Sequence, residues 1–551
     1  MSDRNQRHIP DSEKPTPEKD PSGDGITRSE LLKAAAAAGT GAVLLGGGAA
    51  ARARTRVGPY PAAAADNPIK GMNVLVFMTD QQRAIQHFPK GWAKRNMPGI
   101  DRLQRHGVTF DNACTNACMC SPARSTFLTG YFPAQHRVKY TLESSMPASQ
   151  YPQVELDTDF KNLGTVTEAA GYTPVYKGKF HCVKPANGST WQPSDVNQYG
   201  FTRWDPPDAG ANQSTAEEGG GYYDNDGRFI NSQGTPAAGT EGALQYLSSA
   251  AAQDQPFFMV VSLVNPHDVL SYPKNFTANG YDDSWLLGDI GLPATVDEDL
   301  STKPTVQKQF LRLFTASGPI PTPQMKRNYL NFYGNLMRSS DAYLMKILDT
   351  LVSNGLFENT LVIATSDHGE MGTAHGGMRQ KNFNFYDETI RIPLVYSNPR
   401  LFPRGRTDHS LVSHVDFLPT LASLVGAPSS ARSSWQGVDY SATVLGRASK
   451  PPQDYTVFTY NDYQSGQPSG PYPTPPNHVT SIREHRYKLA RYYDADGNVP
   501  DQWEMYDRLT DPIERVNLAY PGHRRTPTQE SEYNRLQAKL AHVEQTRLKP
   551  L

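Results

Sequence analysis

The sequence predicts an α/β fold in which helices cover both faces of a mixed, mostly parallel sheet. Two segments, Asn73–Met78 and Thr360–Ser366, are mostly apolar and show no alternation of polar and apolar residues. Such runs are typical of strands that are buried on both faces. Strand-like and helix-like segments also alternate along the chain, which is the order expected of a parallel sheet with helices on both sides.

The further elements are predicted from their apolar patterns and from glycines at helix ends. In chain order they are a helix at 98–107, a strand from 108, a helix at 163–171, strands at 173–176 and 256–264, and a helix at 325–354. A smaller C-terminal α+β subdomain, at 446–551, is predicted to hold a short antiparallel sheet and a helix at 526–545.

Two segments in which apolar residues show no regular spacing are predicted to be loops. Residues 190–235 are rich in Gly, Asn, Asp, Trp and Tyr, and they either line a substrate cleft or form plain surface. Residues 465–477 are rich in Pro and are predicted to be a linker or the edge of a lid. Gly and Pro number 44 each, so loops are plentiful, and in enzymes loops often carry the functional site.

Length and composition indicate a large soluble protein. At 551 residues, the chain can build a large core and more than one subdomain. Hydrophobic residues make up 37% of the chain and charged residues 20%, which is ordinary for a globular protein. The net charge is −1 with no basic stripe, so nucleic acid is not an expected partner. Four cysteines in a chain of this length exclude a disulfide scaffold.

The N-terminal region differs from the rest. Residues 1–25 are polar and are predicted to be a disordered tail. Residues 26–66 resemble a twin-arginine export signal, although Ser29 stands where the second Arg belongs, and Ala62–Ala65 offer a cleavage site. We therefore expect export to the medium or the cell envelope; the alternative is an uncleaved tail. The Ala/Gly/Leu run is too short and Gly-rich for a membrane span, and none is predicted elsewhere.

Polar side chains follow the two buried strands directly. Asp80 and Gln81 come after the first, and Asp367 and His368 come after the second. In open α/β sheets, ligands bind at the carboxyl ends of the strands. Two carboxylates with an amide oxygen and an imidazole suit a divalent cation. The alternative is structural, because a strand-end Asp often caps the next helix.

One short motif carries a specific chemical signal. Cys120-Ser121-Pro122-Ala123-Arg124 is followed by Ser125–Gly130. This run resembles the modification signal of type I sulfatases. The resemblance implies that a formylglycine-generating enzyme oxidises Cys120 to formylglycine, whose hydrate attacks sulfur with one hydroxyl and expels sulfate with the other. The alternatives are a buried free cysteine, or a zinc knuckle with Cys114 and Cys118 that lacks a second Cys/His pair at zinc spacing.

The resemblance to the sulfatase family extends from Ile69 to about Ala519. The segments that carry it occur in the family's order, at 178–181, 265–268, 366–381, 391–395, 416–421 and 504–518. The resemblance implies an alkaline-phosphatase-like fold for the α/β part of the chain. It also implies that 67–445 form the catalytic domain.

The resemblance assigns roles to six side chains. Besides the modified Cys120, Lys179 and Lys381 would bind the sulfate oxygens. Arg124 would hold the modified residue. His181 would deprotonate the hydrate and help to expel sulfate, and His267, helped by Lys381, would protonate the leaving oxygen.

The resemblance also implies one divalent metal ion. Its ligands would be Asp80, Gln81, the modified Cys120, Asp367 and His368. Ca²⁺ is the expected ion, while the nitrogen of His368 shifts the preference towards Mg²⁺ or Mn²⁺. Many family members have Asp-Asp and Asp-Asn where this chain has Asp80-Gln81 and Asp367-His368. Both variants resemble the choline-sulfatase and phosphonate monoester hydrolase side of the superfamily.

The expected function is hydrolysis of a sulfate monoester to an alcohol and inorganic sulfate. The substrate would be a small-molecule or carbohydrate sulfate ester. One alternative is a phosphonate monoester or phosphodiester hydrolase that uses the same nucleophile. The other is not an enzyme but an unmodified relative that binds sulfate esters.

Overall fold

The computed structural model describes residues 67–143, 153–186, 190–210, 222–231, 241–314, 317–465 and 470–551. The predicted tail at 1–25 and export signal at 26–66 lie outside the described residues. The predicted loop at 190–235 lies partly inside them, where it contains two short helices, α7 (Ser194–Asn197) and α9 (Gly227–Asn231).

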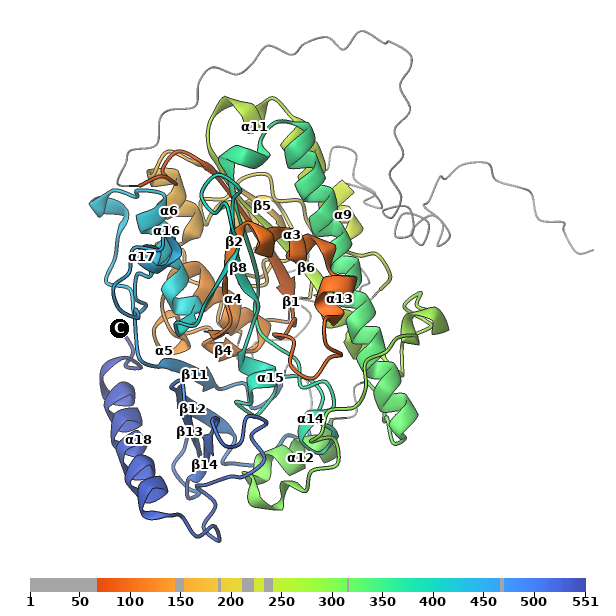
Figure 1. Cartoon of the computed structure of the whole chain (residues 1–551), viewed down its shortest axis with the longest axis vertical. Coiled ribbons are helices and arrows are strands. Elements are labelled where there is room, and N and C mark those ends of the chain that lie inside the picture. The colour runs from red at the N-terminus through yellow and green to blue at the C-terminus, as the bar shows by residue number, and fades with distance from the viewer. Residues whose placement is uncertain are drawn as a thin grey trace, which may run out of the picture. The chain divides into compact units, whose positions relative to one another are not determined.

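A seven-stranded sheet forms the centre of the α/β part (Figure 1). In spatial order its strands are β5 (Thr173–Gly178), β6 (Phe257–Pro266), β1 (Asn73–Asp80), β7 (Thr360–Ser366), β8 (Leu394–Ser397), β2 (Gly107–Phe110) and β9 (Arg406–Asp408). The pairs from β5 to β7 are parallel, β8 is antiparallel to both of its neighbours, and β9 is parallel to β2. The mixed, mostly parallel sheet is therefore confirmed.

Strand β1 shows why the sheet lies at the centre. All of its residues are buried. Val74, Val76 and Met78 belong to one hydrophobic cluster, whereas Leu75 and Phe77 belong to another. Because successive side chains of a strand point to opposite faces, the two clusters are the cores above and below the sheet. An apolar run without alternation is what such a doubly covered strand requires.

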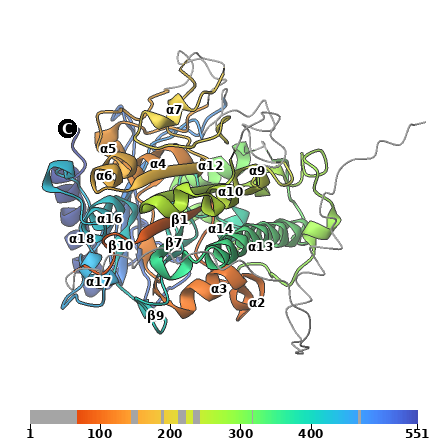
Figure 2. The same ribbon diagram turned by 90° about the horizontal axis from the view of Figure 1, so that it is seen from above.

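Helices cover both faces of this sheet. On one face lie α13 (Pro323–Ser353), α3 (Pro98–Arg105) and α10 (Ala243–Ser248), and on the other lie α4 (Cys120–Thr129), α6 (Leu163–Ala169) and α16 (Phe417–Leu424). Figure 2 shows α13 and α3 across the sheet from α4 and α6. Further helices are α2 (Trp92–Asn96), α5 (Pro133–His136), α11 (Ala251–Asp254), α12 (Thr305–Leu313), α14 (Ala374–Gly377), α15 (Asp387–Ile390) and α17 (Ser441–Val444).

The C-terminal part contains the predicted antiparallel sheet and helix (Figure 1). Its strands β11 (Thr456–Tyr460), β12 (His478–Arg483), β13 (Tyr487–Tyr493) and β14 (Gln502–Asp507) pair in sequence. Helix α18 (Pro527–Thr546) packs Leu536, Leu540 and Val543 against this sheet. A fifth strand, β4 (Ala117–Cys118), joins β11 in parallel. The edge of this sheet therefore leads directly into Cys120.

The predicted elements are found close to their expected positions. The helices at 98–107, 163–171, 325–354 and 526–545 correspond to α3, α6, α13 and α18, and the strand at 256–264 corresponds to β6. A further short pair, β3 (Ala113–Cys114) with β10 (Val412–Ser413), links segments far apart in sequence. Within the described ranges, no helix is both long and apolar enough to cross a bilayer.

Candidate active site

Four neighbouring parallel strands deliver candidate residues to one edge of the sheet. Thr79 pairs with Ser366, so the two acids that follow in sequence lie side by side. The backbone N–H of Asp367 donates to Thr79 O at 3.2 Å, which fixes this register. The candidates at the carboxyl ends of β5, β6, β1 and β7 are, in that order, Lys179, His267, Asp80 and Asp367. This is the edge at which open α/β sheets bind ligands.

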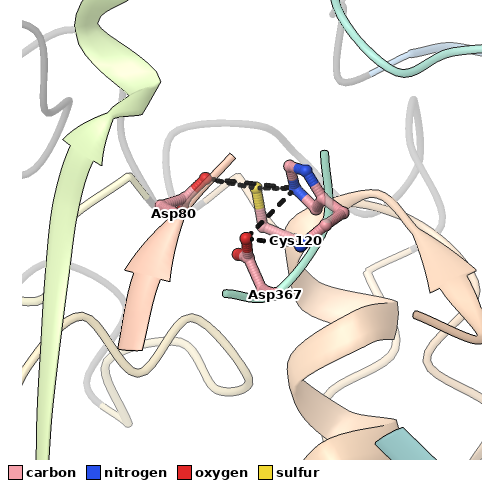
Figure 3. A group of neighbouring side chains, drawn as sticks. Asp80, Cys120 and Asp367 are labelled. Carbon is pink, nitrogen blue, oxygen red and sulfur yellow. Dashed lines mark hydrogen bonds and ion pairs between the residues drawn. The ribbon is translucent and has the colours of Figure 1, made fainter. Parts of the chain in front are cut away.

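A compact, buried group is formed by Asp80, Cys120, Asp367 and His368 (Figure 3). Each residue offers one potential ligand atom, and these four atoms all lie within 4.8 Å of one another. Cys120 Sγ is 3.2 Å from His368 Nε2 and 3.6 Å from Asp80 Oδ1. The structure thus brings together four of the five residues predicted to bind the metal.

The orientation of His368 fits a metal ligand. Its Nδ1 is 3.1 Å from the carbonyl oxygen of Gly369, an arrangement in which Nδ1 carries the proton and donates. Nε2 is then left with its lone pair directed at Cys120. Metal-binding histidines usually donate their second ring N–H in this way. Burial, followed by the charge of Lys381, lowers the pKa of His368 to about 4, so the imidazole is neutral. Two carboxylates and a neutral imidazole suit a divalent cation.

Arg124 joins the strand ends to the helix that begins at Cys120. Its Nε donates to Asp367 Oδ2 at 3.0 Å and its Nη2 donates to Asp80 Oδ2 at 3.1 Å. Nη1 donates to the carbonyl oxygen of Lys179 and to Ser262 Oγ, both at 2.8 Å. Residues four apart lie on one face of a helix, so Cys120 and Arg124 face the same acids. Arg124 therefore holds helix α4 against the ends of strands β1 and β7.

Lys179 lies next to Asp80 inside this network. Its Nζ is 2.5 Å from Asp80 Oδ2, and both side chains are fully buried. Burial alone raises the pKa of Asp80, but Lys179, His267 and Arg124 together hold it well below its usual range. Asp80 is therefore ionised and able to bind a cation.

A buried carboxylate shapes the turn that carries Lys179 and His181. Asp208 accepts backbone N–H groups from Phe180 at 2.8 Å, from His181 at 2.7 Å and from Ala209 at 2.8 Å. His181 has a positive φ of 56°, a conformation that is uncommon for residues other than glycine. The three hydrogen bonds of Asp208 stabilise this turn and so set the position of His181.

His181 is a neutral base with one unused nitrogen. Its Nε2 is 2.7 Å from the carbonyl oxygen of Leu142, so Nε2 carries the proton and donates. Nδ1 is buried and has no hydrogen-bond partner among the described residues. Burial, followed by the positive charge of Lys179, keeps the pKa of His181 well below its usual range. Nδ1 can therefore accept a proton.

His267 is the most exposed of the predicted site residues, at 8%. Its Nδ1 has no hydrogen-bond partner within the described part of the chain. Burial lowers its pKa well below the usual range; the charge of Asp80 opposes this shift, and Lys179 and Lys381 add to it. His267 is thus the predicted site residue with the most access to solvent.

Gln81 and Lys381 bind each other. Lys381 Nζ donates to Gln81 Oε1 at 2.6 Å, and Gln81 Nε2 donates to Glu370 Oε2 at 2.6 Å. The amide oxygen predicted to bind the metal is therefore already used by Lys381. Tyr329 holds the other carboxylate oxygen of Glu370 at 2.7 Å. Gln81 and Glu370 together position Lys381, and the ligand role of Gln81 stays a prediction.

The thiol of Cys120 is poorly suited to act unmodified. Burial, followed by the negative charge of Asp80, raises its pKa to about 12. The thiolate is the nucleophilic form of cysteine, so a neutral buried thiol is inert. Cys114, Cys118 and Cys182 are also free and buried.

Sequence reasoning missed three residues of this site. Asp208, Ser262 and Glu370 each bind a predicted catalytic or metal-binding residue. Glu370 stands in the Asp367 segment and could have been singled out there. Asp208 and Ser262 lie in a loop and in mid-strand, and no local pattern marks them.

Comparisons with known proteins agree with this geometry. The sequence model of the Sulfatase family matches residues 72–427, and that of the C-terminal part of N-sulphoglucosamine sulphohydrolase matches 375–545. The ulvan-active sulfatase of Formosa agariphila is 27% identical over 482 residues, which cover 86% of this chain and 81% of that protein.

Solved structures share the fold. A 2-O GAG sulfatase superposes with a TM-score of 0.65 at 21% identity, covering 86% of this chain and 92% of the other. A phosphonate monoester hydrolase of Agrobacterium radiobacter superposes with a TM-score of 0.62 at 20% identity, covering 86% and 96%. The family match spans more than half of the chain and contains every predicted site residue, so this protein belongs to the sulfatase family.

Proposed function

We propose that this protein hydrolyses a sulfate monoester to an alcohol and inorganic sulfate at Cys120. The observation that carries the proposal is the position of Cys120: it lies among Asp80, Asp367 and His368. Lys179, Arg124 and Lys381 supply positive charge to the same group. A sulfate ester is anionic, so fixed cations are needed before a nucleophile can approach it.

The nucleophile in this proposal is formylglycine formed from Cys120 by a formylglycine-generating enzyme. The Cys-x-Pro-x-Arg motif supports the modification. The modification would supply an aldehyde whose hydrate carries two hydroxyl groups. Arg124 would keep this residue in register with the two strand-end acids through its bonds to Asp80 and Asp367.

Asp80, Asp367, His368 and the modified Cys120 would hold one divalent cation, with Ca²⁺ the proposed ion and Mg²⁺ or Mn²⁺ the alternatives. When bound, the ion would polarise the sulfate oxygens and favour the ionised nucleophile. The buried, ionised Asp80 and the neutral, correctly oriented His368 support this assignment. Arg124 binds Oδ2 of each acid, so it would leave the imidazole and the two Oδ1 atoms to the ion.

The other side chains would bind the sulfate group or transfer protons. Lys179 and Lys381 would neutralise the sulfate oxygens from two sides. His181 would accept a proton at Nδ1, which is neutral and unused among the described contacts. His267, the more exposed histidine, would give a proton to the leaving oxygen. The relative named for activity on ulvan supports a carbohydrate sulfate as substrate.

The second candidate is a phosphonate monoester or phosphodiester hydrolase. The Asp80-Gln81 and Asp367-His368 pairs and the fold shared with a phosphonate monoester hydrolase favour it. Rates with 4-nitrophenyl sulfate and with the matched phenylphosphonate ester would separate the two. Faster turnover of the sulfate by the matured, metal-loaded protein is expected. Faster turnover of the phosphonate would contradict the proposal, and no turnover of either would favour the non-enzymatic alternative.

Export by the twin-arginine route completes the proposal. It is supported by the sequence at 26–66, and export of a folded protein suits an enzyme that is modified before it leaves the cytoplasm. Fractionation of cells that produce the full chain would test it. Protein found outside the cytoplasm is expected, and retention of all of it in the cytoplasm would contradict it.

A further inference from the structure

The last residues of β6 extend beyond the regular pairing of the sheet. On one side, β5 ends at Gly178, which pairs with Ser262. On the other side, the register with β1 shifts after Ser262 and resumes at Pro266. Residues 263–265 are therefore paired in neither register, and they lead through Pro266 to His267. Buried N–H groups in such a stretch need acceptors from outside the sheet.

The carboxylate of Asp226 supplies two of these acceptors. Its Oδ1 accepts the N–H of Val264 at 2.6 Å, and its Oδ2 accepts the N–H of Asn265 at 3.1 Å. All three side chains are buried. Burial raises the pKa of Asp226 to about 6, although the two N–H groups oppose this shift, so most of the carboxylate is ionised at pH 7. One carboxylate thus replaces the missing strand, and the second of its contacts lies two residues before His267.

The ring of His267 depends on this backbone for its position. Among the described residues, no hydrogen bond holds the ring, and its buried Nδ1 has no partner. The backbone that leads to it is held from two sides. Asp226 binds the N–H of Asn265, and Ser340 Oγ of α13 donates to the carbonyl oxygen of Asn265 at 3.3 Å. A shift of the backbone at 264–265 would therefore move His267.

The segment that carries this carboxylate is itself anchored. Arg228 Nη1 donates to the carbonyl oxygen of Pro207 at 3.0 Å. Phe229 belongs to a small buried hydrophobic cluster with Ala209 and Val264. These contacts hold the carboxylate between β6 and the neighbouring loop, so it can fix the position of the strand end.

We propose that Asp226 is a positioning residue for His267 and acts through the backbone at 264–265. This inference rests on the proposed function, in which His267 protonates the leaving oxygen. Proton transfer requires the donor to lie within hydrogen-bond reach of the acceptor, and small misplacements of a catalytic group are costly. Loss of the carboxylate should therefore impair protonation of the leaving oxygen. A carboxylate that only stabilised the fold would affect all esters alike.

The first test compares leaving groups in the matured, metal-loaded full chain. In Asp226→Asn, one accepting oxygen becomes an NH₂ group, which cannot accept the N–H that it faces. We expect kcat for an alkyl or sugar sulfate to fall by about 10-fold or more, and that for 4-nitrophenyl sulfate by less than about 3-fold. Metal content should stay at the wild-type level. Asp224→Asn is the matched control and should leave both rates unchanged, because the Asp224 carboxylate binds the Tyr343 hydroxyl of α13 instead of β6.

A double variant shows whether Asp226 acts through His267. In a His267→Ala background, Asp226→Asn should slow the alkyl sulfate by less than about 2-fold, because the group that it positions is already absent. Two independent contributions would instead multiply. Asp226→Glu keeps the charge but moves it one methylene further from the backbone, so its rate with the alkyl sulfate should lie between those of wild type and Asp226→Asn.

The outcomes distinguish this inference from the proposed function. Equal slowing of aryl and alkyl esters, multiplied losses in the double variant, or wild-type rates in Asp226→Asn would overturn the positioning role and leave the sulfatase proposal standing. If Asp226→Asn does not fold, Asp226→Glu is used for the same comparisons. Failure of both variants to fold would identify Asp226 as a requirement of the fold and would also overturn the positioning role. No turnover of any sulfate ester by the wild-type protein would instead contradict the proposed function itself.

Discussion

Asp80 ends β1, Asp367 follows the adjacent parallel strand β7, and the two carboxylates share a single guanidinium. Arg124 contacts Oδ2 of both acids, at 3.1 and 3.0 Å, and all three side chains are buried. Two buried carboxylates this close repel each other unless a cation lies between or beside them. Arg124 and Lys179 supply part of that charge from the Oδ2 side. The Oδ1 atoms face Cys120 and His368 on the other side, where the proposed metal ion would supply the rest.

Replacement of either acid should therefore remove the metal ion. Asp80→Asn and Asp367→Asn keep the shape of the side chain but remove one negative charge from the site. We expect elemental analysis to show loss of the divalent ion together with loss of activity. Gln81→Ala is the matched control, and it should keep the ion because its amide oxygen is bound to Lys381. Full metal content in both Asp variants would show that these acids are not the ligands.

The two histidines should respond differently to the leaving group. General acid catalysis contributes about 10²–10⁴-fold in rate, and esters of weakly acidic alcohols need it most. His267→Ala should therefore slow an alkyl or sugar sulfate far more than 4-nitrophenyl sulfate. Rates across a series of leaving groups measure this dependence. An equal slowing of all esters would show that His267 does not protonate the leaving oxygen.

His181→Ala should instead impair the release of sulfate. Its Nδ1, which has no hydrogen-bond partner among the described residues, is the proposed base, so its loss should affect the first half of the reaction less than the second. Rapid-mixing experiments should show a burst of alcohol that exceeds the inorganic sulfate released. Equal amounts of the two products at all times would contradict this role.

Asp208 should act by positioning rather than by chemistry. The carboxylate of Asp208 accepts N–H groups from Phe180, His181 and Ala209 through both of its oxygens. In Asp208→Asn, one of these oxygens becomes an NH₂ group, which cannot accept a hydrogen bond. We expect kcat to fall by about 10-fold or more, because small misplacements of catalytic groups are costly, with KM and metal content little changed. Asp205→Asn is the control: Asp205 lies three residues away, and its carboxylate binds Lys177 and the backbone N–H of Glu241. Unchanged kcat in Asp208→Asn would refute the positioning role.

Stability in acid should depend on Glu388. Burial alone raises its pKa, but His375, whose Nε2 lies 3.7 Å from Glu388 Oε2, and then the charge of Arg83 lower it from 4.5 to about 2. A lowered carboxylate pKa stabilises the fold above pH 4.5, and this stabilisation is lost as the pH falls towards 2. The full effect is about 3 kcal/mol. Thermal unfolding midpoints between pH 5 and 2.5 should fall less steeply in Glu388→Gln than in wild type, and parallel curves would contradict the assignment.

The fold could be predicted from the sequence where local pattern decides the structure. The apolar runs at β1 and β7 and the helix α13 were predicted within a few residues of their bounds. The start of α13 was placed two residues late, although Thr322 caps it and Pro323 opens it. Strand β4 could not be predicted, because Ala117–Cys118 is too short to carry a pattern and pairs with a strand more than 300 residues later.

The residues of the site could be predicted only from their position after an apolar strand or from their match to a family motif. Asp80 and Asp367 were placed correctly because each follows an apolar strand. Their adjacency depends on the order of strands in the sheet, which no local signal contains. The role of Gln81 as a metal ligand stays a prediction, but its amide oxygen also accepts a hydrogen bond from Lys381, 300 residues away. Such competition between partners is decided by tertiary packing, so the sequence cannot reveal it.

The mass of the peptide that contains Cys120 tests the central claim most directly. Protein co-produced with a formylglycine-generating enzyme should yield a peptide in which the CH₂–SH group has been replaced by an aldehyde, and the modified fraction should scale with sulfatase activity across preparations. Cys120→Ser, which cannot be converted by oxidation of a thiol, should keep the fold and show less than about a tenth of the wild-type rate, or at least 1.4 kcal/mol more barrier. An unmodified Cys120 in a fully active preparation would contradict the account.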